Sequence, residues 1–175
     1  MYINVIMLYE CEFCNITMKG EATLVTYSII KLQPEDYYKC GNIWDMNRNC
    51  ENSKKWYEEL VKGTRIIFVY IENGQFIGEG ALVLHNSDPD YTIAGKRVYL
   101  SRMIVKTEYR NRGIGSIILD FLIIYAKTLG FEEISVGVDI DNIVARHLYE
   151  KKGFTNIIFE GEDDLGKYIK ILKKI

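Results

Sequence analysis

The sequence has little proline, little histidine and no surplus of charge of one sign. Two of its 175 residues are proline, two are histidine, and the formal net charge is −2 at pH 7. This balance gives no electrostatic footprint for nucleic acid. No apolar run approaches the length of about 20 residues that a membrane-spanning helix needs, and the apolar start at residues 1–9 lacks the features of a signal peptide. We therefore expect a cytoplasmic protein with neither nucleic-acid nor membrane partners.

Cysteine is also scarce, and its spacing gives little support for a metal site. Cys11 and Cys14 have the Cys-x-x-Cys spacing of zinc and redox sites. A zinc site would need two more ligands, however, and Cys40 and Cys50 are not closely spaced. We expect four reduced thiols, as is usual for cytosolic proteins, and no metal.

The length and composition fit one globular domain. Hydrophobic residues make up 48% of the chain and charged residues 26%, which is ordinary for a soluble fold. Residues 1–20 fit the pattern of the remaining chain poorly, so we predict an N-terminal extension there, with an extra strand as one option. A single domain is predicted over residues 21–175.

Apolar periodicity and turn residues predict alternating strands and helices. Pro34 stands where a helix can begin, Ser53 is a predicted N-cap, and Gly63 is predicted to end that second helix. Asn73-Gly74 favours a type I′ hairpin. Strands are expected at residues 22–32, 65–72, 75–84, 98–105, 133–138, 154–160 and 168–172, and further helices at 113–127 and 142–152.

The order of these elements indicates the fold class. Residues 65–105 predict an antiparallel meander, whereas the strand, helix and strand between residues 98 and 138 need a right-handed crossover between parallel strands. We therefore predict an α/β fold with a mixed, mostly antiparallel sheet and helices on both faces.

One segment has the composition of an anion-binding site. Arg110-Asn111-Arg112-Gly113-Ile114-Gly115 follows a predicted strand and opens a predicted helix. Glycines let a ligand approach the backbone, and the first turn of a helix offers unpaired N–H groups with partial positive charge. A pyrophosphate fits such a site. The segment is neither a Walker loop nor a Rossmann fingerprint, because it lacks the Gly-Lys-Ser/Thr ending and the third glycine.

The wider context resembles a known family. Residues 103–115 are similar to the pyrophosphate motif of the GNAT superfamily of acyl-CoA-dependent N-acyltransferases, although Thr107 replaces the usual proline. The family's second signature is found in Asn142, Ala145, Tyr149 and Gly153-Phe154. The resemblance extends from about Ala22 to the C-terminus.

This resemblance implies a cofactor, acetyl-CoA, and residues that contact it. In the family, the strand before the loop hydrogen-bonds the pantetheine arm and splays from its parallel partner, where Gly137 would suit a weakened ladder. Asn142 would also bind the pantetheine, or act as a helix N-cap, or do both. The predicted cofactor contacts are Met103, Ile104, Val105, Arg110, Asn111, Arg112, Gly113, Ile114, Gly115, Ser116 and Asn142.

The same resemblance suggests catalytic groups. Tyr149 would be the general acid, because a phenol can protonate the departing CoA thiolate. Its alternative role is one of thirteen tyrosines packed on an amphipathic face. An acceptor amine must lose a proton before attack, and Glu79 is the predicted base, with His85 as a second option. Glu108 and His147 are expected to be structural and solvated, respectively.

The acceptor is predicted to be a small-molecule or peptide amine of unidentified structure, attacked in a ternary complex. Residues expected near it are Tyr37, Tyr38, Trp44, Trp56, Asp88, Asp90 and Tyr91. The alternatives are a CoA-binding sensor without turnover and a generic nucleotide-phosphate binder, which leaves the Asn142 to Phe154 pattern unexplained. Oligomeric state is open, with a homodimer as one option.

Overall fold

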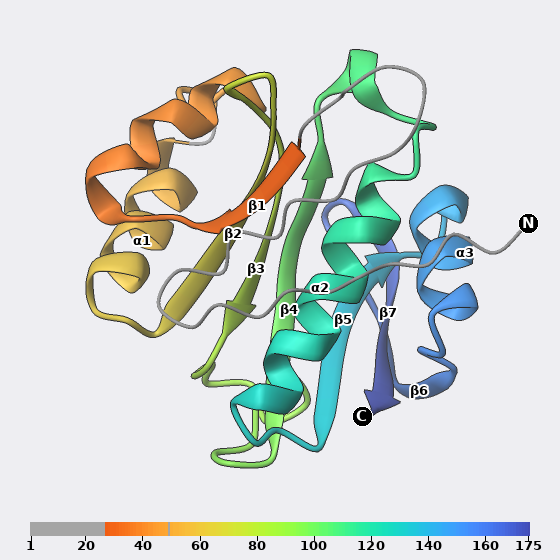
Figure 1. The fold of residues 1–175 in the computed structure, drawn as a ribbon. Helices are drawn as coiled ribbons and strands as arrows, with labels where there is room; N and C mark the ends of the chain where they lie inside the picture. Colours follow the sequence, from red (N-terminus) through yellow and green to blue (C-terminus); the bar gives the residue numbers. More distant parts are fainter. Residues whose placement is uncertain (1–26, 49) are drawn as a thin grey trace, which may run out of the picture.

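The computed structural model describes residues 27–48 and 50–175, which form one seven-stranded sheet in the order β1-β2-β3-β4-β5-β7-β6. Helices cover both faces of this sheet (Figure 1). The mixed α/β fold predicted from the sequence is thus confirmed. The strands are β1 (Tyr27–Lys31), β2 (Arg65–Glu72), β3 (Gln75–Val83), β4 (Arg97–Val105), β5 (Glu133–Asp139), β6 (Asn156–Asp163) and β7 (Gly166–Lys174). The helices are η1 (Pro34–Asn42), α1 (Cys50–Val61), η2 (Thr107–Tyr109), α2 (Ile114–Thr128) and α3 (Ile143–Lys151).

Strands β2 to β4 form the expected antiparallel meander, and β1 adds to it by pairing antiparallel with β2. Asn73 and Gly74 have φ values of 50° and 75° between β2 and β3, which is the backbone of a type I′ hairpin turn. Strand β1 confirms the described part of the strand predicted at residues 22–32. Residues 22–26, the predicted extension at 1–20, and Cys11 and Cys14 lie outside the described residues.

Two local predictions about the first helices need correction. The segment from Pro34 is a 3-10 helix rather than an α-helix. Helix α1 begins at Cys50, so Ser53 is not its N-cap but lies inside its first turns, where its carbonyl accepts a 3.1 Å hydrogen bond from the Tyr37 hydroxyl. Gly63 does follow the end of α1, with a left-handed φ of 73°.

The parallel strands β4 and β5 pair over only part of their length. Their ladder consists of Arg97 with Glu133, Val98 with Ile134 and Tyr99 with Ser135. Beyond Tyr99 the strands diverge, as Figure 1 shows toward the end of β4. This is the splay expected from the resemblance. Gly137 lies in the diverging part of β5, but its ladder with β7 is unbroken, so the expected weakening affects the β4 side alone.

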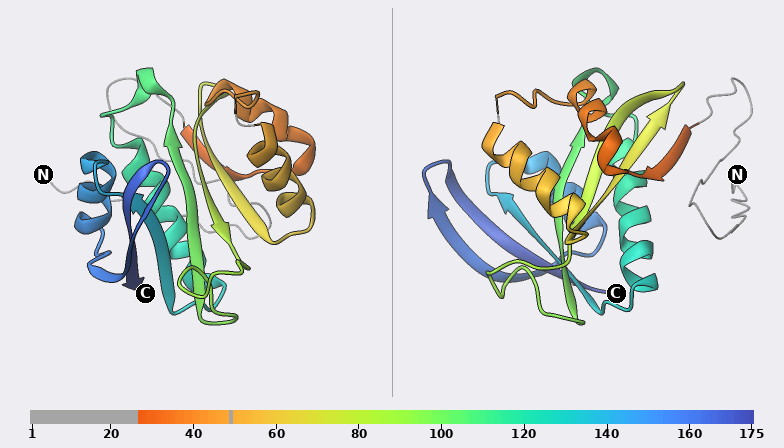
Figure 2. Two further views of the ribbon diagram at one scale, coloured as in Figure 1. Left: turned by 180° about the vertical axis from the view of Figure 1, so that it is seen from behind. Right: turned by 90° about the vertical axis from the view of Figure 1, so that its left-hand side faces the viewer.

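A core on each face holds the sheet between its helices. On one face, α2 and α3 pack on the sheet; Ile118, Leu119 and Leu122 of α2 are fully buried there. On the other face, η1 and α1 cover β1 to β3 through a cluster that includes Tyr37, Cys40 and Trp44. Figure 2 shows α1 and α2 on opposite sides of the sheet. Burying each large apolar side chain contributes roughly 1.5–3 kcal/mol.

A bulge distorts β4 beside the point of divergence. Between the pairs Glu79–Ile104 and Ala81–Ser101, Gly80 of β3 faces two residues of β4, Arg102 and Met103. Glycine is needed at position 80, because a Cβ there would lie 2.6 Å from Leu122 and 2.7 Å from the Met103 sulfur.

Candidate functional site

The open end of β4 leads directly into the predicted anion-binding loop. Gly113 has a left-handed φ of 79° and caps α2 without a side-chain hydrogen bond. The backbone N–H groups of Ile114, Gly115 and Ser116 therefore find no acceptor among the described residues. These donors and the positive end of the helix dipole form an anion-binding turn.

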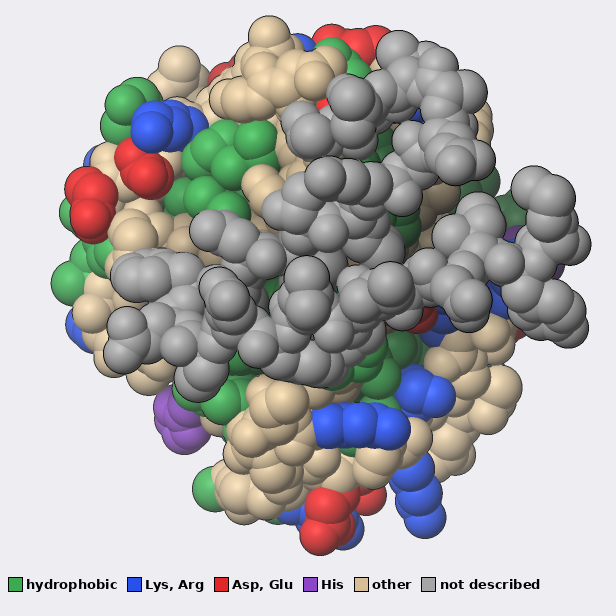
Figure 3. Space-filling model, in the orientation of Figure 1, with side chains coloured by type: hydrophobic (Ala, Val, Ile, Leu, Met, Phe, Trp, Pro, Cys, Tyr) green, Lys and Arg blue, Asp and Glu red, His purple; other side chains and the backbone are tan. Residues whose placement is uncertain are grey.

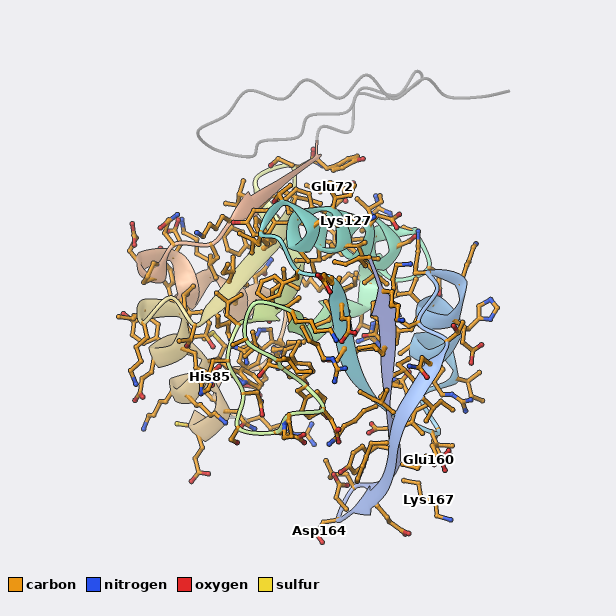
Figure 4. The ribbon with its side chains drawn as sticks, turned by 90° about the horizontal axis from the view of Figure 1, so that it is seen from below. Glu72, His85, Lys127, Glu160, Asp164 and Lys167 are labelled. Carbon is orange, nitrogen blue, oxygen red and sulfur yellow. The ribbon has the colours of Figure 1, made fainter. Side chains whose placement is uncertain are left out.

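The two arginines of this loop differ in their partners. Arg110 is exposed, and its Nε donates to the Val105 carbonyl at 3.0 Å. Arg112 donates to Glu72 Oε1 at 2.6 Å and lies 5.1 Å from the Tyr109 ring centre. Glu72, labelled in Figure 4, ends β2 and is 5% exposed. Glu72 lies 40 residues from Arg112 and belongs to no motif, so the sequence carries no signal for this ion pair.

Helix α3 borders the other side of the divergence. Asn142 is its N-cap, and its Oδ1 accepts a 3.2 Å hydrogen bond from the Ala145 N–H. This structural role is confirmed, and a role in cofactor binding stays a prediction. Tyr149 is 6% exposed and packs against Phe154 with ring centres 5.6 Å apart.

The Tyr149 phenol is close to the position where β4 and β5 part. Burial raises the pKa of Tyr149, and the nearby phenol of Tyr99 adds to that rise. Tyr99 is the last residue of β4 that pairs with β5. The phenol of Tyr149 therefore stays protonated at neutral pH beside the diverging strands.

Glu79, the predicted base, is buried in an ion pair on the opposite face of the sheet. Its Oε1 accepts from Arg102 Nε at 2.8 Å, and the residue is 3% exposed. The guanidinium carbon of Arg102 lies 3.8 Å from the Trp44 ring centre and 4.4 Å from that of Trp56. Both tryptophans are among the residues predicted to lie near the acceptor. Arg102 is not among them, because the bulge that orients it leaves no periodic signal in the sequence.

The remaining proposed acid–base residues lie away from this region. Val83 pairs with Tyr99 and Gly78 with Val105, so His85 follows the end of β3 that is remote from the loop at residues 110–116. Figure 4 labels His85 in the segment after β3. Glu108 pairs with Lys106 at 3.0 Å and is exposed, and His147 is exposed on α3. These positions agree with structural or solvated roles for Glu108 and His147.

The loop between β3 and β4 crosses the face of β5 and β7. Lys170 of β7 forms ion pairs with Asp88 and, at 3.0 Å, with Asp90. The Tyr91 ring packs on Tyr99 with centres 4.2 Å apart. Its hydroxyl occupies the space that a side chain at Gly137 would need. The absence of a side chain at Gly137 thus allows the close approach of Tyr91.

Three further features of the described residues bear on metal binding, membrane insertion and surface charge. Within residues 27–48 and 50–175, no cluster of three or more His, Cys, Asp or Glu side chains could hold a metal ion. In the same ranges no helix is long and apolar enough to cross a bilayer. Acidic and basic side chains appear in small separate groups around the uncovered parts of the face in Figure 3.

Comparison with protein families gives a match across most of this structure. Residues 26–154 match the acetyltransferase (GNAT) family. They include β2 to β5, the loop at 110–116, and α3 with Tyr149. A search of curated proteins gives no match.

Solved structures with the same fold include several acetyltransferases. An N-acetyltransferase from Staphylococcus aureus Mu50 has 21% identity and a TM-score of 0.67, covering 85% of this chain and 98% of its own. Aminoglycoside 6'-acetyltransferase type Ii has 17% identity and a TM-score of 0.67, covering 83% and 96%. The PaiA N-acetyltransferase from Thermoplasma acidophilum, in complex with coenzyme A, has 21% identity and a TM-score of 0.62, covering 85% and 99%. At these identities the likeness shows the fold.

Proposed function

Because the chain belongs to the acetyltransferase (GNAT) family, we propose that it transfers the acetyl group of acetyl-CoA to a primary amine. The observation that carries this proposal is the divergence of β4 from β5 beside the unpaired N–H groups of α2. A phosphate-binding turn and an open strand edge are thereby joined in one stretch of chain. Coenzyme A in the Thermoplasma acidophilum relative supports the same class of donor.

The residues present fit an acyl-CoA. The first turn of α2 and the exposed Arg110 would hold the pyrophosphate, because both offer donors without a competing carboxylate. Arg112 would contribute less charge than the sequence suggested, because Glu72 balances it. Beyond Tyr99, the edge of β4 that faces β5 has no ladder partner within residues 27–48 and 50–175. In this open stretch Met103, Ile104 and Val105 would bind the pantetheine amides, and Asn142 would border it from α3.

The bound donor supplies a thioester whose carbonyl carbon is open to nucleophilic attack. We expect the neutral amine to attack it directly: the C–N bond forms, the C–S bond breaks to release the thiolate, and the proton of the attacking nitrogen passes to water. Tyr149 would protonate that thiolate, because its phenol stays protonated beside the divergence. Within the described residues neither Cys40 nor Cys50 belongs to the loop or to α3, so a covalent acyl-enzyme is not part of the proposal.

Glu79 has a weaker case as the base. Its 3% exposure and its ion pair with Arg102 separate it from a solvent-borne amine. The Glu79→Gln variant tests this role. If Glu79 is the base, the variant should lower kcat for every amine and remove one limb of the pH–rate profile. If Glu79 serves only as the ion-pair partner of Arg102, kcat for simple amines should stay unchanged.

The burial of Glu79 also favours the alternative function, a sensor that binds acetyl-CoA without turnover. A protein that binds acetyl-CoA without turnover would keep the phosphate-binding turn and need no accessible base. Thiol release from acetyl-CoA, measured across small amines, amino acids and peptides, separates the two functions. Amine-dependent release supports the acetyltransferase. Acetyl-CoA binding with no release for any amine class would overturn it and favour the sensor.

A further inference from the structure

Arg102 occupies an unusual backbone position at the open end of β4. Its φ of 59° is left-handed, and it is one of two β4 residues that bulge opposite Gly80. This conformation is unfavourable for a non-glycine residue, and residues strained in this way cluster at active sites and ligand clamps. The position lies three residues beyond Tyr99, the last residue paired with β5. Arg102 is therefore held beside the divergence despite the conformational cost.

The surrounding side chains hold the planar guanidinium of Arg102 in one orientation. Trp44 and Trp56 lie 3.8 and 4.4 Å from its central carbon, and Glu79 accepts its Nε–H at 2.8 Å. Cation–π contacts and a buried ion pair together restrict rotation of this long side chain. Little conformational entropy remains to be lost when a ligand binds to it.

Within the described part of the chain, the two terminal amino groups of the Arg102 guanidinium are free to donate hydrogen bonds. Among the described residues, Nη1 and Nη2 of Arg102 have no hydrogen-bond acceptor, and the side chain is 17% exposed. The indole N–H of Trp44, which is 8% exposed, also lacks an acceptor. Arg65, on the same face, differs: it is 4% exposed and its donors reach Glu59 and Ser101. Arg65 is satisfied by the fold, whereas the terminal donors of Arg102 remain available.

Arg102 faces the side of the sheet from which the acceptor would arrive. Its partners are Trp44 between η1 and α1, Trp56 in α1 and Glu79 in β3. The Met103 sulfur, in contrast, lies beside Gly80 on the side of the sheet that α2 covers. The phosphate-binding turn and Tyr149 belong to the α2 and α3 face. A donor held from that face leaves the Arg102 face open to the amine.

We propose that Arg102 is an anchor for a carboxylate carried by the acceptor, so that the acceptor class is an amine with a nearby carboxylate. Glu79 balances the charge of Arg102 but accepts only from its Nε, so the planar pair of terminal amino groups remains to match the two oxygens of a carboxylate. Free amino acids have this chemistry, and so do short peptides whose amino group lies near the C-terminal carboxylate. The inference rests on the proposed function in assuming that an acceptor binds here, and its main test does not depend on turnover.

The two tryptophans of the chain provide a direct probe, because Trp44 and Trp56 both contact Arg102. We would titrate the full chain with CoA present and follow tryptophan fluorescence. N-acetylglycine and N-acetyl-trialanine would be the acids, and their C-terminal amides the matched neutral ligands. We expect a saturable change with one or both acids and at least about tenfold weaker binding of the amides, because hydrogen bonds to charged groups are the stronger class.

Variants then assign the effect to Arg102. Arg102→Gln should abolish the preference for the acid, and Arg102→Lys should weaken it, because lysine keeps the charge but loses the fork. Lys62→Gln, an exposed position directly after α1, is the matched control and should behave as the wild type. Circular dichroism confirms that each variant is folded.

The outcomes separate this inference from the proposed function. Equal responses to acid and amide, no response to either, or a preference that survives in Arg102→Gln would overturn the carboxylate anchor. Thiol release with amines that lack a carboxylate would at the same time leave the acetyltransferase proposal intact. An acid response confined to the trialanine ligand would assign the site to peptides, and a response to acetylglycine to free amino acids.

Discussion

The two ends of β4 differ in what holds them. At its first residues, Arg97 to Tyr99, β4 pairs with β5, and from Tyr99 on it pairs with β3; Arg97 also forms a 2.8 Å ion pair with Glu133 directly across the parallel ladder. At its last residues β4 pairs with β3 alone, contains a bulge and runs into a turn with unpaired N–H groups. The end at Arg97 to Tyr99, called the closed end, contributes stability. The end at Arg102 to Val105, called the open end, leaves backbone donors free for a ligand. Substitutions at the two ends should therefore have separable effects.

The largest effect is expected at the open end from Tyr149→Phe. Removing the hydroxyl removes the proposed proton donor while the ring still packs on Phe154. We expect kcat to fall by about 10²–10⁴-fold, with the affinity for acetyl-CoA and the melting temperature close to those of the wild type. Steady-state kinetics and calorimetry check this. An unchanged kcat would remove Tyr149 from the mechanism.

At the closed end, Arg97→Met should destabilise the fold without changing ligand affinity. It leaves Glu133, 6% exposed, with Lys96 at 3.4 Å as its remaining ion-pair partner. Breaking a buried pair in this way should cost about 3 kcal/mol of unfolding free energy, measured in urea. The double variant Arg97→Met with Glu133→Leu should recover most of the loss. A double variant no more stable than the single one would contradict the assignment.

A smaller effect is expected where the β3–β4 loop crosses β5. Gly137→Ala places a methyl group where the Tyr91 hydroxyl lies, which should cost about 1–3 kcal/mol of unfolding free energy. Combining it with Tyr91→Phe removes the clashing atom and should restore part of that stability. If Gly137→Ala is neutral by urea unfolding, the packing of Tyr91 on β5 is not tight.

The smallest effect is expected from acid. Burial opposes ionisation of Asp88, but the hydrogen bond from Lys170 and the backbone outweigh it and lower the pKa of Asp88. Its contribution to stability is thus complete above its ordinary pKa of about 4 and is lost as pH falls further. The melting-temperature difference between wild type and Asp88→Asn should therefore shrink as the pH falls below that ordinary value. Asp164→Asn, at the exposed β6–β7 turn labelled in Figure 4, should show no such dependence.

Local sequence patterns predicted the fold well because each pattern specifies its own helix, strand or turn. The Asn73-Gly74 turn, the apolar spacing of α2 and the residues of the Arg110–Gly115 loop each define an element without distant information. Helix α1 was misplaced at its start, because Ser53 satisfies a capping preference while Cys50 begins the helix. Glu72 and Arg102 were missed because their importance comes from partners 40 and 23 residues away. Long-range ion pairs and bulges of this kind leave no periodic trace.

Calorimetric titration with acetyl-CoA tests most directly whether the open end of β4 and the start of α2 form the donor site. The wild type should bind with micromolar affinity, that is about −8 kcal/mol. Arg110→Glu and Gly113→Asp should abolish binding while remaining folded, because each places a carboxylate at the phosphate-binding turn. No binding by folded wild-type protein, or undiminished binding by both variants, would contradict the assignment of the site.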